Sequence, residues 1–138
     1  AAMGCAQMEL LPSFIERKRE IASRYTKQLG EIPGITIMPE APWAFSTHWL
    51  YTVLIDAQVF GMDSRALLRL LAKKNVQSRP LWQPLHRSLA LKDCGKFTCP
   101  IADRLNRDAI SLPCSAGLSD EDLQVVIDMV RSAASSRH

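Results

Sequence analysis

Residues 47–55 have the sequence Thr47-His48-Trp49-Leu50-Tyr51-Thr52-Val53-Leu54-Ile55, and this stretch decides the fold. Successive side chains of a β-strand point to opposite faces of its sheet, and here both alternating sets are largely apolar. A strand that is apolar on both faces is typical of the centre of a sheet whose faces are covered. We therefore expect residues 47–55 to form a long central strand.

Shorter strands and several helices are expected around this central strand. Short β-branched or apolar runs predict strands at residues 35–38, 76–79 and 109–112. Helical spacing of apolar residues and the capping residues before them predict the helices. These helices are expected to begin at Ser13, at Asp63 or Ser64, at Pro100 and at Ser119, where Asp122 completes a capping box.

The resulting order of elements, α-β-β-α-β-α-β-α, predicts the fold class. Short strands with helices between and around them indicate an α+β fold, in which a small sheet of three to four short strands is covered by helices. A length of 138 residues corresponds to one ordinary domain. We therefore expect residues 1–138 to form a single domain.

Composition and charge exclude several classes of protein. Hydrophobic residues make up 47% of the chain and charged residues 22%, which is typical of globular and not of disordered proteins. The net charge of +3, with acids and bases interspersed, is too weak to indicate nucleic-acid binding. No apolar run approaches the roughly 20 residues of a membrane helix, and the start lacks the order of a signal peptide. We expect a cytoplasmic domain that binds neither nucleic acid nor membranes.

The cysteines allow two interpretations. Without a secretory signal, a disulfide framework is not expected. Cysteine and histidine are zinc ligands, but the paired C-x-x-C spacing typical of zinc sites is missing. Free cysteine usually packs as a small hydrophobe, so buried or incidental thiols are favoured and a metal or thiol site is the alternative. The cysteines are Cys5, Cys94, Cys99 and Cys114, and the metal or thiol alternative would use the last three together with His86.

Residues 1–30 have helical composition, yet no cap residue or loop comes before them. We expect a helical segment that is truncated at its start, with Pro12 opening a second helical segment because proline is tolerated in a first turn. Met3, Leu10 and Leu11 would then present apolar surface that a missing partner covers. Such surface favours association into a homodimer or a larger species.

Residues 78–86, which we call the ribbon, have the sequence Ser78-Arg79-Pro80-Leu81-Trp82-Gln83-Pro84-Leu85-His86. The two prolines keep this segment out of a helix, because each fixes φ and lacks an N–H. Arg79 offers a guanidinium fork for phosphate or carboxylate, and Trp82 offers a flat ring. His86 can donate, accept or move a proton near neutral pH. This set suits an anionic, ring-bearing ligand; the alternative is a proline-rich surface loop with Trp82 in the core.

The ribbon resembles a loop of the DegT/DnrJ/EryC1/StrS sugar aminotransferases, close to the LegC type of the branch that acts on nucleotide-linked 4-keto sugars. Residues 1–9 resemble the helix that follows an Asn-Tyr-Arg-type segment in that family, and the stretch from residue 14 to residue 25 resembles its continuation. Residues 109–113 and 117–119 resemble the end of the same domain. The resemblance implies the C-terminal small domain of an enzyme with the aspartate-aminotransferase-like fold (fold type I).

The resemblance also implies pyridoxal phosphate as the cofactor of the parent enzyme. In the family the Schiff-base lysine, the acid under the pyridine nitrogen and the phosphate cradle lie in a large N-terminal domain, which would be the partner of this chain. None of the lysines here has the family's Schiff-base context, so we expect the isolated chain to bind no cofactor and to lack transaminase activity. They are Lys18, Lys27, Lys73, Lys74, Lys92 and Lys96.

Roles for individual residues follow from the same resemblance. Arg79 would bind an anion such as the pyrophosphate of a sugar nucleotide, and Trp82 would wall the sugar or the base. His86 would form a hydrogen bond with a sugar hydroxyl or a backbone group. Tyr51 is a further candidate substrate residue and stands where relatives often carry asparagine, whereas Trp49 is expected in the core.

Three interpretations stay open from the sequence. The first is the small domain of an aminotransferase that converts a nucleotide-linked 4-keto sugar to an amino sugar. The second is a non-catalytic binding or dimerisation module with the same fold. The third is a small thiol or metal protein that uses the cysteines and His86.

Overall fold

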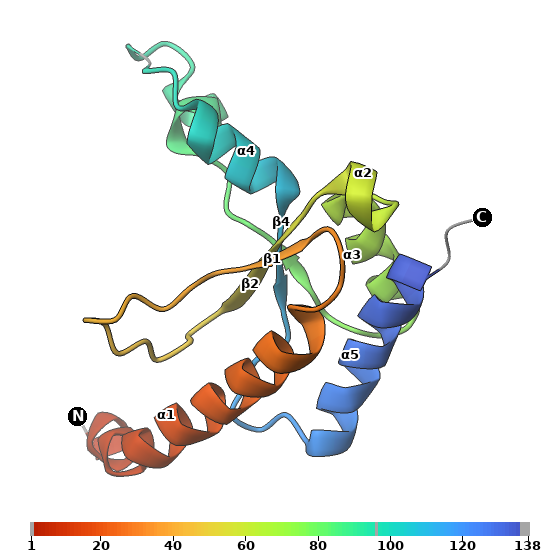
Figure 1. Cartoon of the computed structure of the whole chain (residues 1–138). Coiled ribbons are helices and arrows are strands. Elements are labelled where there is room, and N and C mark those ends of the chain that lie inside the picture. The colour runs from red at the N-terminus through yellow and green to blue at the C-terminus, as the bar shows by residue number, and fades with distance from the viewer. Residues whose placement is uncertain (1, 96, 136–138) are drawn as a thin grey trace.

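The computed structural model describes residues 2–95 and 97–135, which form one sheet, several α-helices and two short 3-10 helices (Figure 1). The elements are α1 (Ala2–Leu29), β1 (Ile35–Ile37), β2 (Tyr51–Ile55), α2 (Ala57–Phe60), α3 (Ser64–Lys73), β3 (Arg79–Pro80), η1 (Leu85–Arg87), η2 (Leu89–Leu91), α4 (Pro100–Asp108), β4 (Ala109–Leu112) and α5 (Asp120–Ser135).

The sheet has four antiparallel strands in the order β1-β2-β4-β3. Val53 of β2 pairs with Ile37 on one side and with Ile110 on the other, so β2 is a central strand. On the far side of β4, Arg79 pairs with Ser111 and places the start of the ribbon at the edge of the sheet. The predicted α+β class and the small sheet covered by helices are confirmed.

The central strand is shorter than the sequence predicts. β2 begins at Tyr51, because His48 has a φ of +46°, a left-handed conformation that interrupts an extended chain. Its partner β4 ends at Leu112, and the following Pro113 has no N–H with which to extend the ladder. The prediction of strand over residues 47–50 is therefore wrong. Of the strand expected at residues 76–79, only residue 79 is in a strand, β3, which consists of residues 79 and 80.

Helix α1 runs without interruption through Pro12, so the prediction that Pro12 opens a second helical segment is wrong. Beside Pro12, the Ser13 hydroxyl donates a hydrogen bond to the Leu10 carbonyl at 2.7 Å. Only the second half of the helix is buried, at Ile21, Ala22, Tyr25 and Leu29. The first half projects beyond the rest of the molecule, as Figure 1 shows.

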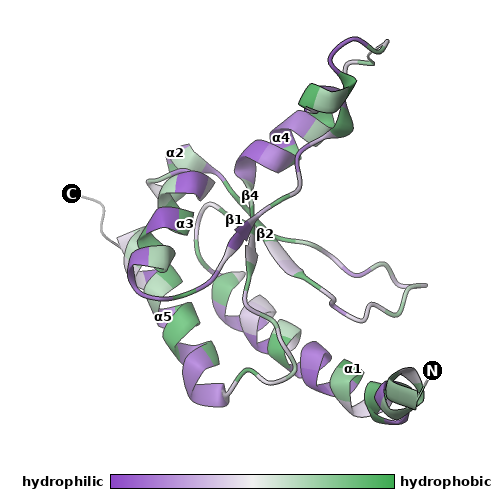
Figure 2. Cartoon of the chain, turned by 180° about the vertical axis from the view of Figure 1, so that it is seen from behind, coloured by the Kyte–Doolittle hydropathy of each residue, from purple (hydrophilic) through white to green (hydrophobic). Residues whose placement is uncertain are grey.

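The core lies where α1, α3 and α5 pack together against the face of β2 that carries Tyr51, Val53 and Ile55. In Figure 2 the helices α3 and α5 each have an apolar and a hydrophilic side. Helix α4 points away from these helices (Figure 1). The segment that precedes it in the chain contains exposed apolar residues such as Leu89 and Phe97. Among the helices of residues 2–95 and 97–135, none combines the length and the apolarity that crossing a bilayer requires.

Capping predictions agree well with the structure. The Asp63 carboxylate accepts a hydrogen bond from the Ala66 N–H at 2.6 Å at the start of α3. The Ser119 hydroxyl accepts one from the Asp122 N–H at 3.0 Å at the start of α5, which is half of the expected capping box. The Asp122 carboxylate accepts from the Ser119 hydroxyl at 2.9 Å, where a full capping box would use the Ser119 N–H. The short helix α2 was not expected from the sequence, although Asp56 caps it in the same way.

The connection between β1 and β2, residues 38–50, is a long loop that Arg19 of α1 holds in place. The guanidinium binds the Glu40 carboxylate through two nitrogens, at 2.9 and 3.1 Å, and donates to the Ser46 carbonyl at 2.7 Å. Its carbon also lies 4.3 Å from the centre of the Phe45 ring. Hydrogen bonds from Arg19 and from the Ser46 N–H lower the pKa of Glu40 to about 2. The ionised carboxylate is therefore the form that the folded loop prefers.

We predict that Glu40→Gln makes stability less sensitive to acid. The pKa of Glu40 is about 2 in the folded chain and about 4.3 in an unfolded one. The contribution of the ionised Glu40 carboxylate to stability is therefore fully present above its pKa in the unfolded chain. It is lost as the pH falls toward its pKa in the folded chain. Thermal unfolding between neutral pH and about pH 2 should show the wild type losing its advantage over Glu40→Gln across this window. A difference that stays constant with pH would show that Glu40 does not tie the loop to α1.

Candidate functional site

A hollow of about 320 Å³ lies beside the edge of the sheet, between α1, β3 and the connection from β4 to α5. We call it the Arg79 hollow. Its lining combines two cations, an indole ring, a hydroxyl, an amide and a thiol, contributed by four separate segments of the chain. These residues are Lys18, Trp49, Gln77, Arg79, Ser111 and Cys114.

Lys18 fixes the walls of the Arg79 hollow. Its Nζ donates to the Cys114 carbonyl at 2.8 Å and to the Trp49 carbonyl at 3.1 Å. The Cys114 thiol, at 3.3 Å, also donates to the Trp49 carbonyl. The segment before β2 and the segment after β4 are thereby joined to the middle of α1. Nothing in the sequence indicates this role of Lys18, whose side chain is half-buried in the structure.

Arg79 is the exposed cation of this hollow. Its backbone is set by pairing with Ser111, whose hydroxyl lies 2.8 Å from the Thr52 hydroxyl of the next strand. Within residues 2–95 and 97–135, no carboxylate forms an ion pair with Arg79. A guanidinium fork held at a sheet edge without a counter-ion can take a phosphate or carboxylate group through two hydrogen bonds.

Two tryptophans form an aromatic wall next to Arg79. The ring centres of Trp49 and Trp82 lie 5.6 Å apart with an interplanar angle of 70°, an edge-to-face arrangement. Trp82 is 70% exposed and Trp49 is 64% exposed. The expectation that Trp49 lies in the core is therefore wrong, because the left-handed turn at His48 takes residue 49 out of the strand. The alternative placement of Trp82 in the core is wrong as well.

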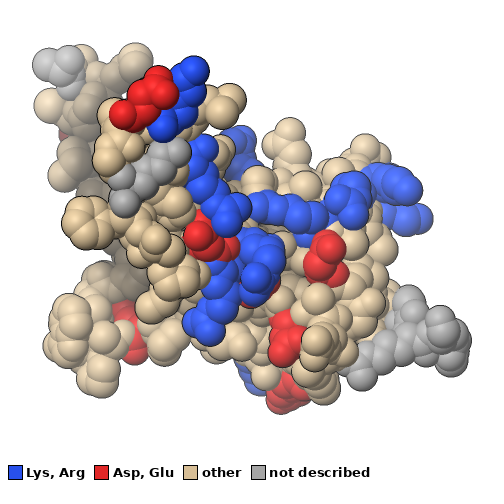
Figure 3. Space-filling view, turned by 90° about the horizontal axis from the view of Figure 1, so that it is seen from above, with Lys and Arg blue, Asp and Glu red and all other residues tan. Residues whose placement is uncertain are grey.

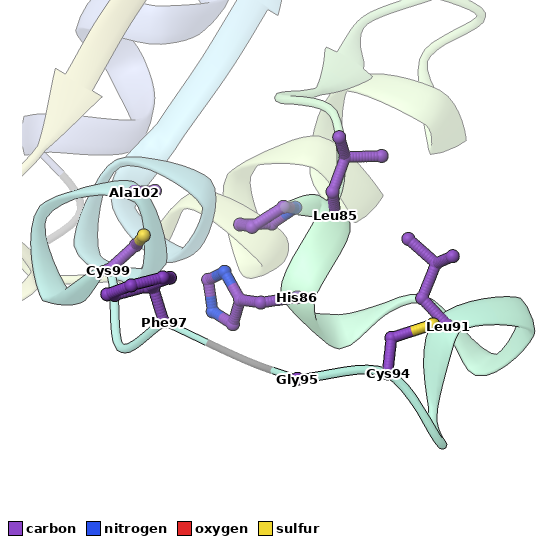
Figure 4. A pocket seen from close by; sticks show the side chains of 9 residues that line it. Leu85, His86, Leu91, Cys94, Gly95, Phe97, Cys99 and Ala102 are labelled. Carbon is purple, nitrogen blue, oxygen red and sulfur yellow. The ribbon is translucent and has the colours of Figure 1, made fainter.

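His86 faces a different hollow, of about 390 Å³, lined largely by apolar groups (Figure 4). The Nε2 atom of His86 lies 2.9 Å from the Asp103 carboxylate of α4. Phe97 and Cys99 lie on one side of the ring, whereas the Cys94 thiol lies beside Leu91 (Figure 4). The ribbon therefore brings Arg79 to one hollow and His86 to another, and Trp82 joins the first through its contact with Trp49. We call the second one the His86 hollow.

Tyr51 lies inside the core and lines neither of these two hollows. It is 4% exposed, stacks on Tyr25 with ring centres 4.9 Å apart, and shares a 2.9 Å hydrogen bond between its hydroxyl and that of Thr26. Burial raises the pKa of its hydroxyl. In this position Tyr51 supports the wall formed by residues 48–50, and a direct contact with substrate stays a prediction.

The candidate metal ligands are divided between the two hollows. Cys94, Cys99 and His86 border the His86 hollow, whereas Cys114 is buried beside the Arg79 hollow. In the part of the chain that the structure describes, no three side chains of His, Cys, Asp or Glu come together as metal ligands would. The zinc interpretation therefore has no geometric support among these residues.

The residues of the Arg79 hollow do not fit the attachment site of pyridoxal phosphate. Such a site needs an amine for covalent attachment and an acid at the pyridine nitrogen. The Arg79 hollow contains Lys18, but its ammonium is bonded to two carbonyls, and no lining residue is acidic. Lys96 lies outside the described residues. The arrangement can bind and orient an anionic, ring-bearing molecule without itself supplying the cofactor's attachment.

Comparison with known proteins identifies relatives of this chain. A model of the DegT/DnrJ/EryC1/StrS aminotransferase family matches residues 1–131. The GDP-perosamine synthase of Vibrio cholerae is 27% identical over 133 residues, which cover 96% of this chain and 36% of that protein. The dTDP-4-dehydro-2,3,6-trideoxy-D-glucose 4-aminotransferase of Saccharopolyspora spinosa is 29% identical over 135 residues, covering 96% and 33%.

Solved structures show the same relationship. The aminotransferase TlmJ from Streptoalloteichus hindustanus superposes with a TM-score of 0.87 and 31% identity, over 96% of this chain and 35% of that one. The chain thus spans about a third of the length of the relatives it matches. The fold is that of a portion of these aminotransferases.

We predict that Trp49 and Trp82 stabilise each other. Trp49→Ala, Trp82→Ala and the double variant form a cycle, and edge-to-face aromatic pairs contribute about 0.5–1.5 kcal/mol beyond the area they bury. The free energy of unfolding in urea should therefore fall less in the double variant than the sum of the single losses, by about that amount. Additive losses would mean that the two rings do not form one wall in solution.

Proposed function

The chain belongs to the DegT/DnrJ/EryC1/StrS aminotransferase family, and we propose that it is the C-terminal portion of an enzyme that converts a nucleotide-linked 4-keto sugar to an amino sugar. Two of its relatives carry names that refer to GDP-linked or dTDP-linked sugar chemistry. The sequence of the ribbon further favours the LegC type within the family. The parent enzyme would use pyridoxal phosphate, which supplies an electron sink when bound.

The observation that carries this proposal is the pairing of an uncompensated guanidinium with an exposed aromatic wall. Arg79 would bind the pyrophosphate of the sugar nucleotide through its two parallel donors. Trp82, supported by Trp49, would pack on the face of the sugar or the base. The face of the molecule in Figure 3 shows more basic than acidic side chains, and such a surplus attracts anions.

The catalytic chemistry would take place against another domain. No acidic residue lines the Arg79 hollow beside Lys18. We therefore assign the cofactor to an N-terminal domain that would cover the Arg79 hollow. Arg79 and Trp82 would bind and orient the substrate from the side opposite that domain. We expect this chain alone to show no transaminase activity with added pyridoxal phosphate.

A second candidate function, a binding or dimerisation module, rests on the exposed apolar residues. Met3 is 84% exposed and Met8 65% exposed in the projecting half of α1. Leu10, Leu11 and Phe45 lie nearby and are also exposed. Monomeric proteins rarely leave such contiguous apolar surface uncovered, and both functions require a partner for it.

Arg79→Ala tests the proposed ligand contact. The loss of a charge-assisted hydrogen bond costs about 1.5–3 kcal/mol, so affinity for dTDP should fall roughly ten- to a hundredfold. Thermal stability should change little, because Arg79 is exposed and forms no ion pair with a described residue. Titration followed by NMR measures the affinity, and Arg104→Ala, an exposed arginine of α4, serves as the control.

Two results would contradict the proposal. One is an Arg79→Ala variant that binds dTDP as tightly as the wild type. The other is a variant that unfolds while its folded fraction keeps full affinity, since the ribbon would then be structural. Trp82→Ala should also weaken binding, with some loss of stability from the broken contact with Trp49.

We also predict that the chain associates in solution. Sedimentation should detect a dimer or larger species, and Met8→Glu, which puts a charge into the apolar surface of α1, should shift the distribution toward monomer. Glu9→Gln, on the same exposed turn, is the matched control. A monomer over a wide concentration range would argue that this surface does not drive association.

A further inference from the structure

Helix α4 holds the backbone of the ribbon through Asn106. The amide nitrogen of Asn106 donates to the Leu81 carbonyl at 2.7 Å and to the Trp82 carbonyl at 3.0 Å. The two protons of this amide are thus donated to two successive carbonyls. The ribbon cannot donate from Pro80 or Pro84, which have no N–H, so this external clamp fixes a segment with few bonds of its own.

A second residue of the same helix, Asp103, holds the side chain of His86. One carboxylate oxygen lies 2.9 Å from His86 Nε2 and 2.6 Å from Arg87 Nε. Asp103 is one helical turn before Asn106, so both side chains lie on the same side of α4, facing the ribbon. The helix therefore positions the ribbon at both its tryptophan and its histidine.

The protonation state of Asp103 decides how His86 is oriented. Partial burial acts to raise the pKa of Asp103, but the hydrogen bonds from His86 and Arg87 outweigh it, and the pKa is lowered. An ionised carboxylate can only accept hydrogen bonds. The proton in the bond between Asp103 and His86 is therefore carried by Nε2.

In the neutral form of His86 the other ring nitrogen is left as an acceptor. In a neutral imidazole with its proton on Nε2, Nδ1 has a free lone pair. No hydrogen bond to Nδ1 occurs among residues 2–95 and 97–135. The ring borders the His86 hollow, with its side chain 19% exposed (Figure 4).

We propose that Asp103 and Asn106 are positioning residues of the substrate site. Asn106 holds the ribbon so that Trp82 faces the ligand, and Asp103 holds His86 so that Nδ1 accepts a hydrogen bond from a hydroxyl of the sugar. This inference rests on the proposed function, because the hydroxyl belongs to the sugar part of the nucleotide sugar. Neither residue contacts the ligand itself.

The experiment compares Asp103→Asn with Asp108→Asn. Both residues are acids of α4 with similar exposure, 25% and 28% of the side chain, but among the described residues Asp108 pairs only with the adjacent Arg107. NMR of the ligand-free chain should show a His86 Nε2–H proton that exchanges slowly with water, assigned with His86→Gln. In Asp103→Asn its exchange should be about tenfold faster, and in Asp108→Asn it should be unchanged.

The second measurement uses dTDP-glucose and dTDP as probes. Asp103→Asn should weaken binding of dTDP-glucose about fivefold, as expected for one neutral hydrogen bond, and should leave binding of dTDP unchanged. Asn106→Ala should weaken both, since it frees the ribbon around Trp82. Asn106→Asp, which keeps the shape and loses both donors, replaces it if the alanine variant unfolds.

The outcomes separate this inference from the proposed function. If Asp103→Asn leaves the Nε2–H proton and the dTDP-glucose affinity unchanged, the positioning role is overturned. If Asp103→Asn weakens binding of both probes equally, Asp103 stabilises the fold and does not orient His86, which also overturns the proposal. If Arg79→Ala weakens binding of both probes while Asp103→Asn has no effect, the proposed function stands and the positioning role of Asp103 is overturned. A chain that binds neither probe overturns the sugar contact, and the exchange measurement still decides whether Asp103 orients His86.

Discussion

Contacts between α1 and the ends of the two central strands, β2 and β4, organise the structure. Tyr25 stacks on Tyr51 of β2, and its hydroxyl donates to the carbonyl of Pro113, directly after β4, at 2.8 Å. Two turns earlier, Lys18 binds the carbonyls of Trp49 and Cys114. The pairing of β2 with β4 and the position of both walls of the Arg79 hollow follow from these bonds.

The binding chemistry sits on irregular backbone that regular elements restrain. The ribbon leaves the sheet edge at Arg79, is held by Asn106 at Trp82, and reaches Asp103 at His86. A backbone held in this way loses little freedom when a ligand arrives, which lowers the cost of binding. The loop of residues 38–50 is restrained similarly by Arg19, and it supplies Trp49 to the same wall.

Local signals in the sequence were enough for most of the fold. Capping residues and apolar spacing identified α3 at Asp63 and α5 at Ser119, because these signals act over a few neighbouring residues. The positive φ of His48, the exposure of Trp49 and the bond between His86 and Asp103 could not be read in this way. Each depends on contacts between distant segments, and the two residues of the last pair stand 17 positions apart in the chain. The chemistry of Arg79 and Trp82 was visible from residue type, whereas the separation of His86 into its own hollow was not.

The most direct test of the central claim is a crystal structure of this chain with dTDP-glucose bound. We expect the pyrophosphate on the Arg79 guanidinium and a ring of the ligand packed on Trp82. A ligand bound elsewhere, with Arg79 and both tryptophans free of contact, would contradict the claim that the ribbon is the substrate-binding segment.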